Sequence, residues 1–260
     1  MLLEKLLVYT GSSDYSMRLH VLGCGDAFGS GGRHQSGYLF EASDRLFLLD
    51  CGPTTLLAMK RAGFAPRRLD AIILSHLHGD HFGGIPFFFI EYLYQHPPAI
   101  PVTIAGPPDT RERVMELCKV MYGSGKSPAQ STPFTFQILH PKESASVKGI
   151  EVFPFRVPHQ TGDISLALKV TYEGRRILFS GDSAWTDEFI AHANGMDLFL
   201  CECSFFTEQP ALHINYQQLR ANRERLECKK LLLTHLGEEM LARKNELEIP
   251  FAEDGMVLTV

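Results

Sequence analysis

The chain contains the stretch Ser75-His76-Leu77-His78-Gly79-Asp80-His81-Phe82-Gly83-Gly84, which directly follows the apolar run Ala71-Ile72-Ile73-Leu74. Imidazole nitrogens and carboxylate oxygens are ligands that suit zinc, manganese and iron. His76 and His78 are two positions apart, so in an extended chain their side chains leave on the same face and can bind one ion. Gly79 is expected to let the backbone turn, so that Asp80 and His81 point elsewhere. This spacing suggests two metal ions rather than one.

Three further residues that can bind metal stand at the ends of apolar, strand-like segments. His159 comes after Val157-Pro158, Asp182 lies within Phe179-Ser180-Gly181-Asp182-Ser183, and His235 comes after Leu233-Thr234. Each segment alone is a weak signal. Their shared placement is stronger, because each delivers one histidine or aspartate at the carboxyl end of a strand, as the first stretch does. We expect these three side chains to supply the ligands that the first stretch lacks.

Composition and charge narrow the class of protein. The 260 residues are 45% hydrophobic and 21% charged, which is typical of a soluble globular protein. Lys and Arg total 25 against 30 for Asp and Glu, a net charge of −5 that argues against a dedicated nucleic-acid-binding protein. The six cysteines form no Cys-x-x-Cys pair, which indicates reduced thiols and a cytoplasmic location. No apolar run reaches the roughly 18 residues of a membrane span, so no membrane association is expected.

The order of the expected elements indicates an α/β fold without a repeat or an internal linker. Hydrophobic patterns predict strands at 18–22, 36–40, 45–50, 71–74, 101–105, 134–138, 150–157, 164–171, 176–179, 197–200 and 230–233, and helices at 54–62, 84–94, 109–121, 187–193, 216–225 and 237–244. The glycine-rich segment 23–32 precedes a strand and lacks the spacing of a dinucleotide-binding loop. We expect a loose N-terminal extension over residues 1–16 and one domain over residues 17–260.

The first stretch resembles the His-x-His-x-Asp-His signature of the metallo-β-lactamase superfamily. This resemblance implies a four-layer αββα sandwich of two mixed sheets. It assigns one metal to His76, His78 and His159, the other to Asp80, His81 and His235, and the bridging position to Asp182. The implied cofactors are two divalent ions, zinc first, with manganese or iron as alternatives. Asp50, in Asp50-Cys51-Gly52, either accepts a hydrogen bond from a ligand histidine or caps the following helix.

Further motifs resemble the ribonuclease Z and phosphodiesterase branch of this superfamily. They are Leu22-Gly23-Cys24-Gly25-Asp26-Ala27, Ser180-Gly181-Asp182-Ser183, Glu202-Cys203-Ser204-Phe205 and His213-Ile214-Asn215. The likeness implies that His213 contacts the scissile phosphate and protonates the leaving oxygen, for which an imidazole is suited. The alternative for His213 is a surface residue at the start of a helix. Asp80 would have a second, catalytic duty in orienting the attacking hydroxide.

The chain departs from two members of the superfamily. Ribonuclease Z enzymes carry a long tRNA-binding arm between the equivalents of His159 and Asp182, but here only 22 residues separate them and they predict a hairpin. A tRNA substrate is therefore not expected. Lactonases of the superfamily have a tyrosine three residues after the bridging aspartate, where this chain has Trp185. This difference weakens the lactonase interpretation.

Three hypotheses about function follow from these residues. The leading one is a phosphodiesterase in which two metals hold a bridging hydroxide that attacks a small or short phosphodiester. The others are a lactone or thioester hydrolase and a non-catalytic metal-binding carrier or sensor. The loops 30–35, 123–133 and 207–212 would face the substrate, and a homodimer is compatible with each hypothesis.

Overall fold

Two β-sheets lie face to face in the computed structural model, which describes residues 16–95, 101–123, 134–207 and 212–260. The first sheet has the strand order β13-β1-β2-β3-β4-β5-β6 and the second the order β12-β11-β10-β9-β8-β7. Both sheets mix parallel and antiparallel pairs; for example, β4 is parallel to β3, whereas β2 is antiparallel to it. The first sheet is built from β1 (Arg18–Gly23), β2 (Gly37–Glu41), β3 (Leu46–Leu49), β4 (Ala71–Ile73), β5 (Val102–Gly106), β6 (Phe134–Ile138) and β13 (Val257–Thr259). The second is built from β7 (Ala145–Val147), β8 (Ile150–Arg156), β9 (Leu166–Tyr172), β10 (Arg175–Phe179), β11 (Leu198–Glu202) and β12 (Lys230–Thr234).

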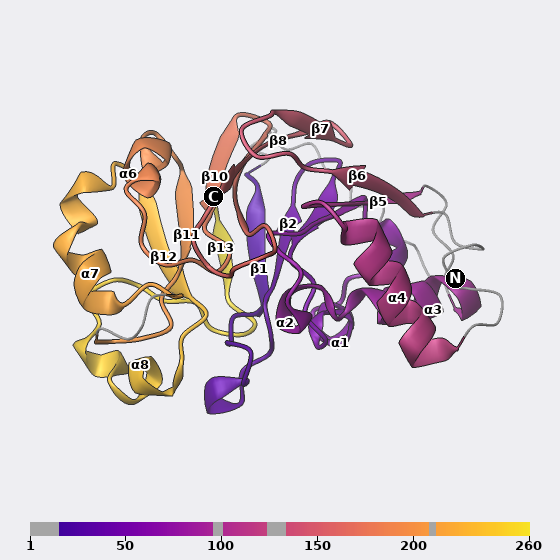
Figure 1. The fold of residues 1–260 in the computed structure, drawn as a ribbon, viewed down its shortest axis with the longest axis horizontal. Helices are drawn as coiled ribbons and strands as arrows, with labels where there is room; N and C mark the ends of the chain where they lie inside the picture. Colours follow the sequence, from indigo (N-terminus) through magenta and orange to yellow (C-terminus); the bar gives the residue numbers. More distant parts are fainter. Residues whose placement is uncertain (1–15, 96–100, 124–133, 208–211) are drawn as a thin grey trace, which may run out of the picture.

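Helices cover the outer face of each sheet. Figure 1 shows α1 (Thr55–Arg61), α3 (Ile85–Tyr94) and α4 (Thr110–Tyr122) on one side of the strands. On the other side lie α6 (Glu188–Ala193), α7 (Tyr216–Ala221) and α8 (Glu238–Ala242). The order of layers is therefore helix, sheet, sheet, helix, and the predicted αββα sandwich is confirmed. None of the helices in the described ranges is long and apolar enough to cross a membrane.

Three apolar layers stabilise this arrangement, and single strands contribute to two of them. In β3, Phe47 and Leu49 point into the layer between the sheets, whereas Leu46 and Leu48 pack under the helices. This alternation follows from the two-residue repeat of a strand. The strands are thus apolar on both faces because both faces are covered, which explains why the sequence shows continuous apolar runs.

The chain directions bring several loops to one edge of the sandwich. Strands β10, β11 and β12 run parallel to one another, and β8 runs the same way because both β8 and β10 are antiparallel to β9. The carboxyl ends of these strands therefore share one edge. The loop after β4 meets them there, since Leu166 N donates to the Ser75 carbonyl at 3.0 Å. The segments that carry His159, Asp182 and His235 follow β8, β10 and β12 at this edge.

The structure differs from the sequence-based expectations mainly at helix ends. The predicted helices 216–225 and 237–244 are shorter, and each is followed by a 3₁₀ turn, Arg223–Arg225 and Lys244–Glu246. Strands β7 and β13, of three residues each, were not expected. The expected hairpin between His159 and Asp182 is present as β9 and β10. Of the predicted extension 1–16, all but Ser16 lies outside the described residues.

Asp197 provides a test of the second sheet through the pH dependence of stability. Its buried carboxylate accepts hydrogen bonds from Arg176 N at 2.8 Å and Lys229 Nζ at 2.7 Å. Burial raises the pKa of Asp197, but these bonds outweigh it and hold the pKa below the ordinary value of 3.8. Because the folded-state pKa is the lower one, the stabilisation is present above the unfolded pKa and is lost as the pH falls through the folded pKa.

We expect Asp197→Asn to lower the free energy of unfolding by about 1 kcal/mol at neutral pH, since Lys229 is largely exposed. The difference should shrink toward zero in acid. Urea unfolding of both proteins at several pH values measures it, with Glu116→Gln on the exposed side of α4 as the control. An equal loss of stability at neutral and acidic pH would contradict the ionic interpretation.

Candidate metal centre

The first stretch is extended up to His78 and then turns into a short helix. The helix α2 (Gly79–Phe82) places Asp80 and His81 in its single turn, and His81 N donates to His78 O at 3.0 Å. Gly79 is not the glycine that this turn needs, because it lacks a positive φ and a Cβ there would meet nothing within 4 Å. A Cβ on Gly84 would lie 2.2 Å from Gly52 O, so Gly84 is needed for close packing of this loop against the Asp50-Cys51-Gly52 segment.

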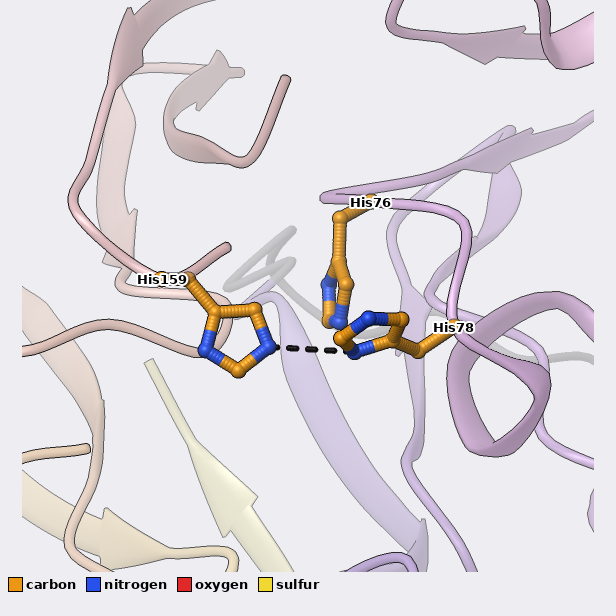
Figure 2. A group of neighbouring side chains, drawn as sticks. All are labelled: His76, His78 and His159. Atoms are coloured by element: carbon orange, nitrogen blue, oxygen red, sulfur yellow. Dashed lines mark hydrogen bonds between the residues drawn. The ribbon is translucent and has the colours of Figure 1, made fainter. Parts of the chain in front are cut away.

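His76, His78 and His159 form the first group of potential ligands. Their ligand atoms all lie within 4.8 Å of one another. Figure 2 shows the three rings converging, with His76 and His78 on one segment and His159 on another. The dashed line joins His159 Nε2 to His78 Nδ1 at 3.0 Å. Burial, with the charge on His81 adding to it, holds the pKa of His76 well below its usual range, which favours the neutral imidazole that binds metal.

Asp80, His81, Asp182 and His235 form the second group, and their ligand atoms also lie within 4.8 Å of one another. Asp80 Oδ2 lies 3.1 Å from His81 Nε2 and 3.4 Å from His235 Nε2. Burial raises the pKa of Asp80, but the charge on His81 and the hydrogen bond from His235 lower it more, to well below the usual range. The Asp80 carboxylate is therefore ionised at neutral pH.

One oxygen of Asp182 reaches both groups. Its Oδ2 lies 3.9 Å from His76 Nε2 and 3.8 Å from His159 Nε2 in the first group. The same atom lies 3.3 Å from His81 Nε2 and 3.4 Å from His235 Nε2 in the second. Burial raises the pKa of Asp182, but the charges on His235 and His81 outweigh it and hold the pKa well below its usual range. The structure thus brings all seven predicted ligands together, with an ionised carboxylate between two groups.

Buried polar partners orient the rings. Asp50 accepts hydrogen bonds from Ser75 N at 2.7 Å and Ser75 Oγ at 2.8 Å, and its Oδ2 lies 2.7 Å from His81 Nδ1. This confirms the hydrogen bond that was predicted between Asp50 and a ligand histidine. Ser204 Oγ lies 2.9 Å from His235 Nδ1, so that His235 also has a partner for its second nitrogen. Such partners fix the ring direction and leave Nε2 free for a metal.

The donor set fits divalent metal ions. His76 Nε2 and His81 Nε2 are buried and have no hydrogen-bond partner among the described residues. A buried polar atom without a hydrogen-bond partner is costly, and a divalent ion that accepts the lone pair of each nitrogen, once deprotonated, would satisfy both atoms. Nitrogen and carboxylate oxygen together suit zinc, manganese or iron rather than magnesium or calcium.

His213 lies beside the second group and has a buried carboxylate as its partner. Its Nδ1 lies 2.8 Å from Glu202 Oε1, and its ring stacks on that of His235 with 5.5 Å between centroids. Burial lowers the pKa of His213, but the hydrogen bond and charge of Glu202 outweigh it and raise the pKa to about 9. Glu202 also accepts hydrogen bonds from Ser183 N and Ser204 N. No role was predicted for Glu202, although a carboxylate at the end of an apolar strand was a usable signal.

A cavity of about 460 Å³ opens beside the two groups. Phe28, Phe205 and Leu212 supply apolar side chains to its wall, and Phe28 is 91% exposed. Of the loops expected to face the substrate, 30–35 contributes Ser30 to the lining. Leu212 also lines the cavity, but the rest of the loop 207–212 except Thr207 lies outside the described residues, as does the loop 123–133 except Gly123. The polar and metal-binding residues of the lining are Asp26, Ser30, His78, Asp80, His159, Asp182, Ser204, His213, His235, Glu238 and Glu239.

A family model described as "Anti-Pycsar protein Apyc1" matches residues 17–258. The chain belongs to this family. The fold is the metallo-β-lactamase fold. The chain is 28% identical over 234 residues to "Probable metallo-hydrolase YhfI" of Bacillus subtilis (strain 168), a match that covers 85% of this chain and 87% of that protein. The crystal structure of YhfI, described as a metallo-β-lactamase fold protein, covers 93% of this chain and 99% of its own, with a TM-score of 0.73 and 25% identity.

This Apyc1-family chain is also similar in sequence to a ribonuclease and in fold to a diphosphatase. It is 32% identical over 145 residues to "Ribonuclease Z" of Bradyrhizobium diazoefficiens, a match that covers 56% of this chain and 47% of that protein. A "New Diphosphatase from the PhnP Family" has a structure with a TM-score of 0.75 and 18% identity, covering 94% of this chain and 98% of its own, which shows a shared fold. The sequence matches to YhfI and to ribonuclease Z support a metal-binding hydrolase that is similar to ribonuclease Z.

Proposed function

We propose that the chain is a dinuclear metal-dependent phosphodiesterase that hydrolyses a small or short phosphodiester. The observation that carries the proposal is the position of Asp182 Oδ2 between two groups of histidine nitrogens, at 3.3 to 3.9 Å from four of them. When bound, two divalent ions would supply a hydroxide at neutral pH and neutralise charge on the phosphoryl group.

The residues of the chain have separate roles in this proposal. One metal would be bound by His76, His78 and His159, the other by Asp80, His81 and His235, with Asp182 shared between them. Asp80 would also orient the nucleophile, because its carboxylate is ionised and lines the cavity. His213 would donate a proton to the leaving oxygen, and Glu202 would hold its ring through the 2.8 Å contact at Nδ1.

Phosphodiester chemistry is favoured over lactone or thioester hydrolysis by two observations. His213 lines the cavity beside both groups, where it can protonate a leaving oxygen, a step that the thiolate released from a thioester does not need. Trp185, which replaces the tyrosine of the lactonases, is not among the residues that line this cavity; its Nε1 donates to Asp187 Oδ1 at 3.1 Å. The name of the ribonuclease Z relative also describes an enzyme that cleaves phosphodiesters.

A substrate panel tests the proposal. The metal-free chain is loaded separately with Zn²⁺, Mn²⁺ or Fe²⁺, its metal content is measured, and its turnover of bis(p-nitrophenyl) phosphate and other small phosphodiesters is compared with that of a lactone and a thioester. We expect two ions per chain and a preference for phosphodiesters. Faster turnover of the lactone or thioester would contradict the proposal, and full metal loading without turnover of any substrate would favour a carrier or sensor.

Replacement of Asp80 with alanine is expected to abolish turnover and reduce the bound metal. The change removes a carboxylate whose Oδ2 lies within 3.4 Å of the Nε2 atoms of His81 and His235. Metal analysis and kinetics with bis(p-nitrophenyl) phosphate measure the two effects. Asp187→Ala is a suitable control because Asp187 is exposed at the start of α6. Full activity of Asp80→Ala would exclude the assigned role.

A further inference from the structure

His78 differs from the other predicted ligand histidines in how its ring is oriented. In each of the other four, Nδ1 lies within 3.0 Å of a partner outside the two groups. The pairs are His76 with Ser75 Oγ, His81 with Asp50 Oδ2, His159 with Leu212 O, and His235 with Ser204 Oγ. Within the described ranges, the one hydrogen bond of the His78 ring joins its Nδ1 to Nε2 of His159. No separate group therefore holds this ring, although such a partner is usual for a metal-binding histidine. The position of His78 depends on its backbone.

Arg113 on α4 contacts that backbone. Its Nη2 donates a hydrogen bond to the carbonyl oxygen of Leu77 at 3.2 Å. This carbonyl belongs to the peptide group that joins Leu77 to His78, so the contact acts directly on the chain that carries the His78 ring. A guanidinium is a rigid fork of donors, and a bond to it restricts direction as well as distance.

The same guanidinium also reaches the loop that carries His159. Arg113 Nη1 lies 3.3 Å from Asp163 Oδ2, and Asp163 is four positions after His159. The base of this loop is closed by a hydrogen bond from Val157 N to Ser165 O at 3.0 Å. Arg113 thus joins the two segments that Figure 2 shows meeting at the His78 and His159 rings.

The second group depends less on Arg113. The guanidinium also lies over the ring of Phe82, at 5.9 Å from Cζ to the centroid, close to the roughly 6 Å limit of a cation–π interaction. Phe82 is buried in the apolar layer under the helices. His81, which precedes it, is held by Asp50 at 2.7 Å. Loss of Arg113 should therefore disturb the first group more than the second.

We propose that Arg113 is a positioning residue for the metal position formed by His76, His78 and His159. By holding the Leu77 carbonyl and the Asp163 carboxylate with one guanidinium, it sets the distance between His78 and His159. It has no assigned contact with the substrate. The inference rests on the two metal positions of the proposed function.

Metal titration of the Arg113→Ala variant tests this role. The metal-free chain is titrated with Zn²⁺ in competition with a chromophoric chelator, which yields the dissociation constants of both positions. We expect one dissociation constant to rise about tenfold or more and the other to change by less than about threefold, since mutations of residues that orient metal ligands cost about 10- to 100-fold in metal affinity.

Two further variants serve as comparisons. Arg113→Lys should show a smaller rise in the same dissociation constant, because an ammonium does not present two donors in a fixed fork. Arg111→Ala, at an exposed position of the same helix, is the control.

Two backgrounds identify which position has changed. In Asp80→Ala, which retains the three histidines of the first group, Arg113→Ala should still weaken Zn²⁺ binding. In His159→Ala, it should have no further effect. A double-mutant cycle between Arg113→Ala and Asp163→Asn should be non-additive, because the two side chains form one contact.

An equal rise in the two Zn²⁺ dissociation constants of Arg113→Ala, or no change in either, would overturn the role of Arg113. If Arg113→Ala does not fold, Arg113→Lys and Asp163→Asn, which retain most of the side-chain volume, provide the comparison. The two proposals fail in different ways. A wild-type chain that binds only one ion would contradict the dinuclear centre. A wild-type chain that binds two ions, both with equally reduced affinity in Arg113→Ala, would contradict only the inference about Arg113.

Discussion

An Asp182→Ala variant is expected to lose activity by about 10³-fold or more and to bind fewer than two metal ions, since bound metals contribute several kcal/mol to transition-state stabilisation. Asp182 is 3% exposed, and its Oδ2 lies 3.9 Å from His76 Nε2 in the first group and 3.3 Å from His81 Nε2 in the second. Without the carboxylate, four buried imidazoles face one another with less negative charge to balance the metals. The loss of bound metal should therefore exceed that caused by removing a ligand from one group alone.

Metal content, affinity and turnover are measured together for this variant. Asp182→Asn keeps the size of the side chain and removes its charge, so a similar loss in Asn and Ala would assign the effect to charge rather than to packing. Far-ultraviolet circular dichroism reports whether each variant folds. Two fully bound ions and unchanged turnover in Asp182→Ala would contradict the shared position of this carboxylate.

Replacement of His213 with glutamine is expected to slow hydrolysis in a way that depends on the leaving group. Removing a general acid costs about 10²- to 10⁴-fold when the leaving oxygen must be protonated. An alkoxide needs that proton, whereas p-nitrophenolate is stable without it. The turnover of an alkyl phosphodiester should therefore fall by about this factor, and the turnover of bis(p-nitrophenyl) phosphate should fall much less.

The metal content of His213→Gln should stay at the wild-type value, because His213 is not assigned to either metal. Glu202→Gln is the companion variant, since Glu202 Oε1 lies 2.8 Å from His213 Nδ1 and should act through that ring. An equal loss on both substrates would argue against proton donation to the leaving oxygen. Loss of metal would instead make His213 a ligand.

The expectations from the sequence were most successful where a short pattern contains all the needed information. An apolar strand followed by a histidine or aspartate can be recognised locally, and the strands that end before His159, Asp182 and His235 were all predicted. Helix ends were less predictable, because the last turns at Arg223–Arg225 and Lys244–Glu246 adopt 3₁₀ geometry that the hydrophobic pattern does not distinguish. The expectation that Gly79 is needed for the turn was wrong for a related reason. Whether a position requires glycine depends on which backbone atoms lie close to it in the folded chain, as Gly52 O lies close to Gly84.

The order of the elements along the chain indicated an α/β fold, and the histidines and aspartates at strand ends were recognisable as candidate ligands, since both depend on local patterns. The αββα sandwich and the division of seven ligands between two metals were implied by the resemblance to the metallo-β-lactamase superfamily. Three features of the site required the folded structure: the approach of one Asp182 oxygen to both groups, the pairing of Glu202 with His213, and the link from Arg113 to Leu77 and Asp163. These contacts join residues from different segments of the sequence, and no local pattern predicts that they meet. They arise because two sheets and a covering helix bring their loops to one edge, where direction and distance decide which atoms meet.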